Sequence, residues 1–468
     1  MSEIAEDCNG RPLISRGFWF RLVAAALAVR VFVVFVLLHS EPLVSDARAY
    51  TRQARELVHH FPGGAYYWPP GQSYLLASVF AVVGDSDAVA KATNIAVDVA
   101  NVVLAVLLAR RLLTDARAIR LTGWLLALFP STVLLAGEPY SLSLTMFCLL
   151  GAALLLLRGD ERNRWLEFAG AGALIGFGVL TRPSVVTVVA ALVVVMGVLV
   201  WRRSRRSPAR VRPLVARSAA FVAVSALVVV PVLHHNADHG QGWTVSTANE
   251  QNFWFGNNPY TPTYKTWELG QRAPTDPKAR QYLERFGFHL GYYRSSSPSR
   301  AQRRAMLHEA TRFIVHHPAI TALRTLDRAQ AFWGFDYTSS NDLRDTLGLT
   351  RAEHLPLVAL EAGGWFIVAL LAVVGLTSAR YLIRTPIALF MLALVLGYAL
   401  AYLAAYASGR WHEPVLGFVV PFAAAGAVWL MDTPGVTRRL RRNPAFLTLA
   451  FVFVIVQLVY AYAVATSI

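Results

Sequence analysis

Asp46 is the first residue in this sequence whose type and setting could carry chemistry. It opens a polar stretch, SDARAYTRQ, shortly after a long apolar run. A carboxylate at a membrane surface can serve as a general base or a metal-linked acid, and a positioned base contributes about 10² to 10⁴-fold to a rate. The alternative role is the cap of a helix over 47–60, which suits aspartate well. Considered alone, the cap is the simpler interpretation, and the two roles are compatible.

Arg182 and Arg410 are cations in short breaks between apolar runs, in the strings LTRP and RWHEP. A charge at the bilayer centre costs about 2.5 to 3.5 kcal/mol on insertion scales, so such residues usually face a cavity. Because arginine matches phosphate geometry, a lipid phosphate is the favoured partner for Arg182, with snorkelling to headgroups as the alternative. For Arg410 and its neighbour His412, a phosphate contact and a plain polar turn are evenly balanced.

Further candidates are aromatic or ionisable residues in neighbouring loops. Tyr67 and Trp68 belong to the string YYWPPG, where aromatic planes suit sugar faces but also form interfacial belts. His59 could bind phosphate or metal, although adjacent histidines on a helix point apart, so His59 and His60 are not expected to share a ligand. Glu138 could pair with Asp46, or it could be a loop residue at the level of the lipid headgroups.

The composition places these residues in a membrane protein. The chain has 468 residues, of which 55% are hydrophobic and 15% charged, against about 25% charged in soluble proteins. Repeated apolar runs of roughly 20 residues predict an all-α polytopic membrane protein. The net charge of +16 comes from arginine clusters between apolar runs, the positive-inside pattern, so no nucleic-acid partner is expected.

About eleven transmembrane helices are expected, with the N-terminus in the cytoplasm. The expected spans are 18–38, 88–109, two within 118–157, two within 165–201, 219–233, 356–378, 386–407, 415–431 and 445–464. The stretch 74–84 is too short to cross, so the first outer loop should carry interfacial helices. A long outer segment should carry two more, over 299–316 and 319–332.

Three regions follow from these spans. An N-terminal transmembrane module covers 1–233 and includes a catalytic first outer loop at 40–87; the other regions are an extracytoplasmic segment at 234–354 and C-terminal helices at 355–468. Every arginine-cluster loop falls on one side of the membrane. Asp46, Glu138, Arg182, Arg410 and the long segment fall on the other. Because only apolar length and arginine clusters placed the helices, this convergence predicts one shared site.

Short motifs along most of the chain resemble the membrane-embedded C-type glycosyltransferases, which use polyprenyl-phosphate sugars. The likeness is to bacterial relatives of protein O-mannosyltransferases and of lipid A aminoarabinose transferase. The matching strings are DARAY from Asp46 to Tyr50, PPGQSYLLA, the EP dipeptide at Glu138, GFGVLTRP around Arg182, GNNP with Asn257 and Asn258, and Arg410 before a proline. No Walker, HExxH or GxSxG motif is present.

The resemblance implies an inverting sugar transfer on the outer side of a bacterial cytoplasmic membrane. By that analogy Asp46 activates the acceptor, which could be a protein, lipid or glycan. Contacts to the donor phosphate are expected from Arg182, Arg410, His59 and His412. Substrate contacts are expected from Tyr50, Tyr67, Trp68, Glu138, Asn257 and Asn258. No cofactor is required by the sequence, and a divalent metal is possible because the family includes both metal-dependent and metal-independent members.

Two interpretations without transferase activity remain open. A lipid or solute transporter or flippase would place ionisable residues near mid-span and show inverted repeats with broken helices. Asp98 is the main mid-span acid, with Asn94 and Asn101 at helical spacing around it, and no clear repeat is visible. These three residues are expected to form an interhelical polar contact. A polytopic assembly partner explains the long outer segment but not Asp46 and Arg182.

Overall fold

The computed structural model describes residues 14–39, 41–60, 63–206, 211–262, 276–288, 298–378 and 385–465. Across these ranges the regular structure is helical throughout, and nine helical segments are long and apolar enough to cross a membrane. They are α1 with η1 (Arg16–Leu37), α4 (Asp87–Leu112), α7 (Ser141–Arg162), η2 with α9 (Pro183–Arg202), α10 (Val211–Asp238), α17 (Arg351–Ser378), α19 (Pro386–Ala404), η4 with α20 (Gly409–Asp432) and α22 (Pro444–Tyr462). The all-α polytopic class is therefore confirmed.

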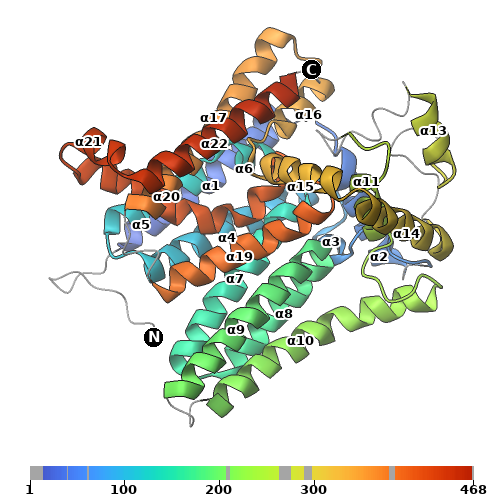
Figure 1. Cartoon of the computed structure of the whole chain (residues 1–468), viewed down its shortest axis with the longest axis horizontal. Helices are drawn as coiled ribbons and strands as arrows, with labels where there is room; N and C mark the ends of the chain where they lie inside the picture. Colours follow the sequence, from blue (N-terminus) through green and yellow to red (C-terminus); the bar gives the residue numbers. More distant parts are fainter. Residues whose placement is uncertain are drawn as a thin grey trace.

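Two shorter helices, labelled in Figure 1, lie where the first halves of the predicted double crossings are expected. Helix α5 (Ala116–Ala127) precedes α7, and α8 (Trp165–Thr181) precedes α9. The 17 residues of α8 extend about 26 Å and the 12 residues of α5 about 18 Å, against about 30 Å of hydrocarbon. Nine of the expected spans thus have helices long enough for a full crossing in the described ranges, and the count of eleven stays a prediction.

Prolines mark the breaks inside both double crossings. Helix α6 (Pro130–Leu135) begins at Pro130, Pro139 stands two residues before α7, and Pro183 starts η2. Proline fixes φ and lacks an N–H, so it begins a helix more readily than it continues one. The residue before it is driven out of the helical region, and Arg182 accordingly has φ −145° and ψ 113°. Its side chain therefore emerges at a break between α8 and α9.

Ion pairs tie the arginine-rich loops to one another at one end of the helix bundle. Arg111 at the end of α4 binds Glu161 at the end of α7, with 2.6 Å between Nη1 and Oε2. Arg117 at the start of α5 pairs with Asp432 at the end of α20. Arg217 of α10 donates to the carbonyl of Gly159, again near the end of α7. The arginine clusters on these helices therefore lie at a common end, as the charge pattern predicts.

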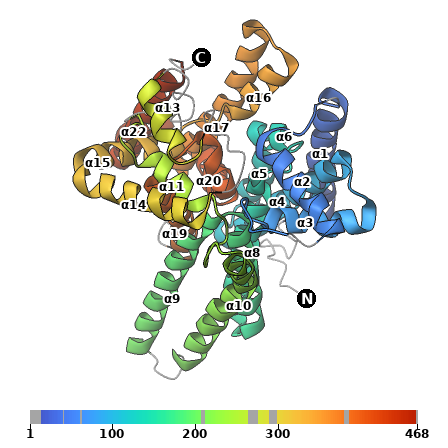
Figure 2. The ribbon, with the colours of Figure 1, turned by 90° about the vertical axis from the view of Figure 1, so that its right-hand side faces the viewer.

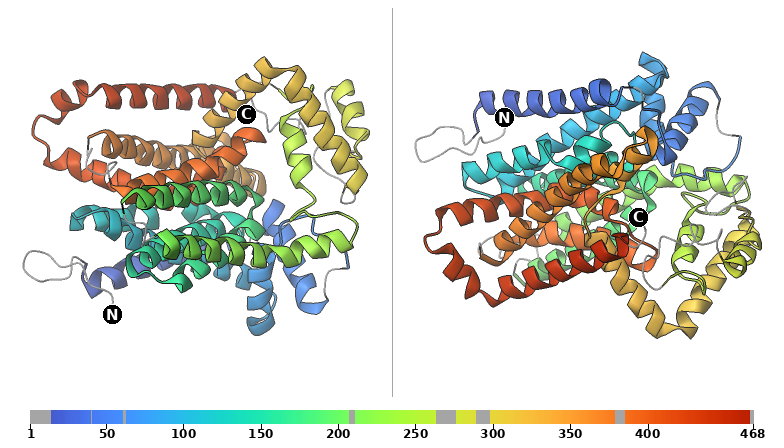
Figure 3. Two further views of the ribbon diagram at one scale, coloured as in Figure 1. Left: turned by 60° about the horizontal axis from the view of Figure 1, so that its bottom comes forward. Right: turned by 90° about the horizontal axis from the view of Figure 1, so that it is seen from above.

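The opposite end carries the short helices. They are α2 (Ser45–His59), α3 (Gly71–Val83), α11 (Asn249–Gly256), α13 (Pro277–Glu284), α14 (Arg300–His316), α15 (Pro318–Trp333) and α16 (Thr338–Leu347). In the left view of Figure 3 the yellow part of the chain and the blue α2 and α3 lie toward the end of the bundle away from the N-terminus. The bounds of α14 and α15 agree closely with the two amphipathic helices expected over 299–316 and 319–332.

Inside the bundle, small residues and one buried ion pair hold the helices together. A Cβ on Gly375 of α17 or on Gly426 of α20 would lie 2.1 Å from a carbonyl oxygen of the other helix, so both glycines are needed for this close packing. Arg30 of α1 is fully buried and pairs with Asp98 of α4. Arg30 also donates to the carbonyl of Ala127 at 2.7 Å. The predicted interhelical contact at Asp98 is thus present, and this acid is occupied by a structural partner.

Candidate active site

Asp46 lies in the first turn of α2, and its carboxylate contacts the start of α7. The hydroxyl of Tyr140 donates a 2.5 Å hydrogen bond to Oδ2 of Asp46. The residue before α2 is Val44, and no side chain caps this helix. Ser45, immediately before Asp46, has a φ of 47°, a conformation uncommon outside glycine that clusters at functional sites. Asp46 is therefore directed at another helix and does not act as the cap of its own.

Arg182 is held by neutral partners. Its Nε donates to the hydroxyl of Tyr402 at 3.1 Å, and its Nη1 donates to Oγ of Ser141 at 3.0 Å. Its guanidinium also lies 6.0 Å from the ring centroid of Trp411 and 5.9 Å from that of Tyr402. Among the described residues no carboxylate forms an ion pair with Arg182. Its positive charge is consequently available to an anion from outside the chain.

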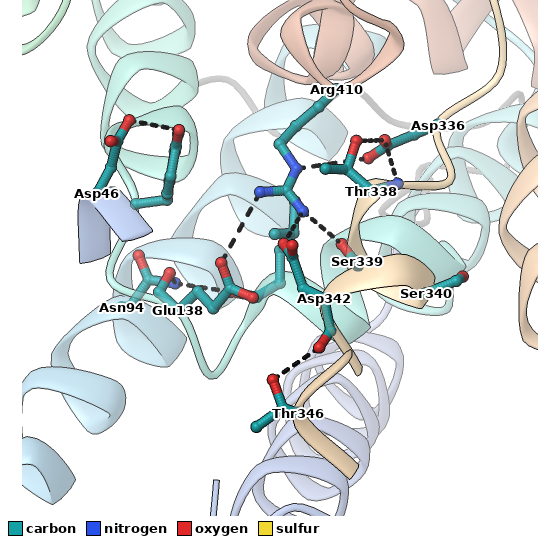
Figure 4. Close-up of polar contacts among 12 residues, drawn as sticks. Asp46, Asn94, Glu138, Asp336, Thr338, Ser339, Ser340, Asp342, Thr346 and Arg410 are labelled. Carbon is teal, nitrogen blue, oxygen red and sulfur yellow. Dashed lines mark hydrogen bonds and ion pairs between the residues drawn. The ribbon is translucent and has the colours of Figure 1, made fainter. Parts of the chain in front are cut away.

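Arg410 is surrounded by acids instead, as Figure 4 shows. Its Nη2 donates to Asp342 at 2.8 Å and contacts Oγ of Ser339 at 3.4 Å. Its Nη1 lies 3.8 Å from Oε2 of Glu138, and its Nε lies 3.9 Å from Oδ2 of Asp336. The Arg410 side chain is only 6% exposed. Arg182 therefore has neutral partners, whereas Arg410 has acidic ones.

Two consecutive residues at the start of α7 bring the three ionic residues together. Tyr140 binds the carboxylate of Asp46, and its ring lies 5.6 Å from the guanidinium carbon of Arg410. The next residue, Ser141, binds Arg182. Asp46, Arg182 and Arg410, here named the ionic cluster, come from three distant parts of the sequence. The convergence that the charge pattern predicts is present in the fold.

Burial and charge act in opposite directions on the carboxyl groups of the site. Burial raises the pKa of Asp46 above its ordinary value, while the hydrogen bond from Tyr140 and the charges of Arg182 and Arg410 oppose that rise. Burial also raises the pKa of Glu138, to about 7, against the lowering effect of Arg410. A carboxylate that is harder to ionise is a stronger proton acceptor once it is ionised.

The first outer loop is fastened to the rest of the site by its aromatic-proline turn. A Cβ on Gly71 would lie 2.6 Å from the backbone nitrogen of Thr181, so glycine is required where α3 begins against the residue before Arg182. The hydroxyl of Tyr67 contacts Gln251 at 3.2 Å. Trp68 lies 6.1 Å from the ring of Tyr50. The turn thereby positions the loop, and Trp68 and Tyr50 lie beside the cluster.

The structure places both candidate histidines away from the ionic cluster, and a phosphate contact by either stays a prediction. His59 is at the far end of α2, about 20 Å along the helix from Asp46, and its exposed side chain lies 3.7 Å from Asp85. His412 is buried, its Nδ1 lies 2.9 Å from the carbonyl of Phe332, and its ring stacks 3.7 Å from Trp365. Neither ring reaches the ionic cluster, because one side chain is on the wrong end of its helix and the other packs in the core.

Asn257 and Asn258 are fully buried, and hydrogen bonds inside the protein already engage both amides. Asn257 donates to the carbonyl of Ala404 at 2.9 Å and accepts from Arg328. Asn258 accepts from the backbone nitrogen of Thr261 at 3.0 Å and donates to the hydroxyl of the same residue. These contacts fasten the outer segment to the end of α19. A substrate contact by either residue stays a prediction, and the present contacts are structural.

Residues 68–235 match the family described as dolichyl-phosphate-mannose-protein mannosyltransferase. The matched stretch contains Trp68, Glu138, Tyr140 and Arg182 of the site, but ends before Arg410. The resemblance to the C-type membrane glycosyltransferases is confirmed. No curated protein matches the chain by sequence.

Comparison with solved structures finds chains that are similar to this one. The oligosaccharyltransferase of Archaeoglobus fulgidus in its apo form is 15% identical with a TM-score of 0.51, covering 97% of this chain and 56% of that one. ArnT from Cupriavidus metallidurans in the apo state is 16% identical with a TM-score of 0.41, covering 88% of this chain and 77% of that one. This chain thus spans little more than half the length of the archaeal enzyme, and likeness at such identity shows the fold alone.

Several residues of this site have no signal in the sequence on their own. Tyr140 and Ser141 directly follow the EP dipeptide, and Trp411 directly follows Arg410, so proximity to a motif is the only hint. Asp336 and Asp342 lie in the long outer segment without any motif. Within the described ranges no three His, Cys, Asp or Glu side chains are placed to hold one metal ion together. The possible metal requirement stays a prediction.

Proposed function

We propose that the protein is a glycosyltransferase that moves a sugar from a polyprenyl-phosphate donor to an acceptor, with inversion at the anomeric carbon. The convergence of a carboxylate, Asp46, and a guanidinium without an acidic partner, Arg182, on adjacent residues of one helix start carries this proposal. The family model that matches residues 68–235 supports a phosphate-linked lipid donor, because its description names dolichyl-phosphate-mannose.

Arg182 is the residue best suited to hold the donor phosphate. Polyprenyl phosphate is the leaving group, so negative charge develops on its oxygens as the glycosidic bond breaks. Fixed donors that are already oriented stabilise such charge without reorganising, and this is usually the largest contribution to catalysis. Tyr402 and Ser141 hold the guanidinium of Arg182 in place but leave its charge uncompensated.

Asp46 is the residue best suited to take the proton of the acceptor. Inversion requires the acceptor to attack the anomeric carbon from the side opposite the phosphate, so base and phosphate contact must lie apart yet face one site. Tyr140 occupies Oδ2 of Asp46, and among the described residues Oδ1 has no hydrogen-bond partner. That oxygen is the proton acceptor in this proposal, and Tyr140 sets its direction.

The site is assigned to the outer face of a bacterial cytoplasmic membrane. Loops rich in arginine stay in the cytoplasm, and the ends joined by the Arg111–Glu161 and Arg117–Asp432 pairs carry those loops. The ionic cluster lies at the other ends of the same helices, since Tyr140 and Ser141 start the helix that Glu161 ends. A donor lipid in the outer leaflet would present its phosphate at this level.

The direct test is release of polyprenyl phosphate by the purified protein from a panel of polyprenyl-phosphate sugars, with a mixture of peptide, lipid and glycan acceptors. Asp46→Asn should lower the rate about 10² to 10⁴-fold while the protein still inserts into the membrane. Asp85→Asn is the matched control, because this exposed acid pairs with His59 away from the site. Full activity of Asp46→Asn would exclude the base assignment, and no release from any donor would exclude the transferase. A chelator in parallel reactions tests the metal requirement.

A further inference from the structure

The acids around Arg410 differ in how firmly each is held. Asp336 is 1% exposed, and its Oδ1 accepts from the backbone nitrogens of Tyr337 and Thr338 and from the Thr338 hydroxyl. Glu138 is 18% exposed and lies 3.8 Å from the guanidinium. Asp342 makes the short contact, at 2.8 Å, and is 32% exposed. Asp342, the carboxylate closest to Arg410, is therefore also the one that water can most readily solvate.

Asp342 lies on α16, a short helix at the edge of the molecule that packs against α17 and α6 (Figure 2). The start of α16 is anchored, because the backbone nitrogen and hydroxyl of Ser340 both donate to Glu361 of α17. Its other end stops at Gly348, whose φ of 65° favours glycine. Two side chains of α16, Asp342 and Ser339, contact Arg410 of the ionic cluster (Figure 4).

A cavity of about 40 Å³, with room for on the order of three water molecules, lies beside α16. Its lining includes Asp342, Leu343 and Thr346 of α16, together with Glu138 and Lys91. The cavity therefore borders two of the acids that surround Arg410, Asp342 and Glu138. Outward movement of the Asp342 end of α16 would enlarge it.

We propose that Asp342 is an internal substitute for the donor phosphate: it occupies Arg410 when no donor is bound and gives Arg410 up when the phosphate arrives. This rests on the proposed function and adds a residue that sets donor affinity. A carboxylate and the unesterified oxygens of a phosphate compete for the same guanidinium fork. Arg182 makes the first contact because its charge is uncompensated, and the phosphate then displaces Asp342 from Nη2 of Arg410. Release of that ion pair frees α16 from the cluster.

The first experiment measures binding of farnesyl phosphate, with farnesol as the uncharged comparison, to the full chain in lipid nanodiscs. Asp342→Asn should tighten farnesyl phosphate binding about five- to fifty-fold. The variant removes the anion that competes with the phosphate for Arg410, and two groups that compete in this way usually change each other's affinity by about such a factor. Farnesol binding should not change. Asp345→Asn is the matched control, because the neighbouring Asp345 is exposed and pairs with Arg344. Combined with Arg410→Gln, the gain from Asp342→Asn should disappear.

The second experiment measures the mobility of α16 directly, and its decisive measurement is made on the wild-type protein. Hydrogen–deuterium exchange of the amides in 338–347 should quicken when the wild-type protein binds farnesyl phosphate. In Asp342→Asn it should already be fast without ligand. Slower or unchanged exchange in the wild type at saturating farnesyl phosphate would overturn the proposal, even if the variant fails to fold.

The outcomes separate this proposal from the proposed function. If the wild type binds farnesyl phosphate more tightly than farnesol but Asp342→Asn weakens binding or leaves it unchanged, Asp342 is not a competitor and only this proposal fails. If the wild type does not distinguish the phosphate from the alcohol, the donor site at Arg182 fails first and the role of Asp342 fails with it.

Discussion

The hydroxyl of Tyr140 donates a 2.5 Å hydrogen bond to Oδ2 of Asp46 across 94 positions of sequence. This bond fixes the carboxylate of α2 against the start of α7. It favours the ionised form of Asp46, whereas burial favours the neutral form. Tyr140 thus sets the orientation of the Asp46 carboxylate and lowers the pH at which this group ionises.

Replacing Tyr140 by phenylalanine should move the acid limb of the pH–rate profile to higher pH. In the proposed function the ionised carboxylate of Asp46 is the base. The lost hydrogen bond favoured that form, so the pKa of Asp46 rises further. A hydrogen bond to a charged group contributes about 1.5 to 3 kcal/mol, which corresponds to a shift of about one to two pH units. The measurement is kcat against pH. An unmoved acid limb with a uniformly lower rate would show that Tyr140 acts through packing alone.

Arg182→Gln should reduce the rate of donor cleavage about 10² to 10³-fold, the usual loss when one donor to a developing negative charge is removed. Arg182→Lys should give an intermediate rate, because lysine keeps the charge but loses the planar fork held by Tyr402 and Ser141. Kinetics with varied donor concentration measure both variants. Arg48→Gln is the control, since the Arg48 side chain donates to the carbonyl of Leu43 in the same loop. A loss no larger than that of the control would exclude Arg182 as the phosphate contact.

Glu138→Gln should behave differently from Asp46→Asn. Because the pKa of Glu138 is raised to about 7, the wild-type side chain is largely neutral in mild acid, and glutamine imitates that state. Activity at about pH 6 should stay within about tenfold of wild type. The stability that a raised pKa contributes is present below the unfolded value and lost as pH rises through the folded one. The Tm of Glu138→Gln relative to that of the wild type should therefore be higher at about pH 8 than at about pH 5. A constant difference between the two proteins would contradict this assignment.

Asp98→Asn should destabilise the bundle by about 3 to 5 kcal/mol, because it leaves the buried guanidinium of Arg30 without its anion. The double variant Arg30→Met with Asp98→Leu should recover most of that loss, since an apolar pair needs no desolvation. Unfolding in detergent measures both. Glu161→Gln breaks an exposed pair with Arg111 and should cost less than about 1 kcal/mol. Equal losses at the two sites would contradict the buried-pair argument.

The sequence by itself determined the fold class and the end of the bundle at which the site lies. Apolar length identifies helices, because hydrocarbon tolerates only chains that satisfy their own backbone hydrogen bonds. Arginine clusters identify one end, and prolines such as Pro183 identify the breaks. Since charges are costly in hydrocarbon, Asp46, Arg182 and Arg410 had to gather at helix ends, and the pattern shows that they share one.

Only the tertiary structure decided which side chains touch. Arg182 meets Tyr402 across 220 positions, and no local pattern encodes such a contact. The same holds for the acids that surround Arg410, for the core position of His412 and for the place of His59 at the far end of its helix. Helix periodicity gives the face of a residue, but its partners depend on how whole helices pack, and packing follows from the shapes of many side chains together.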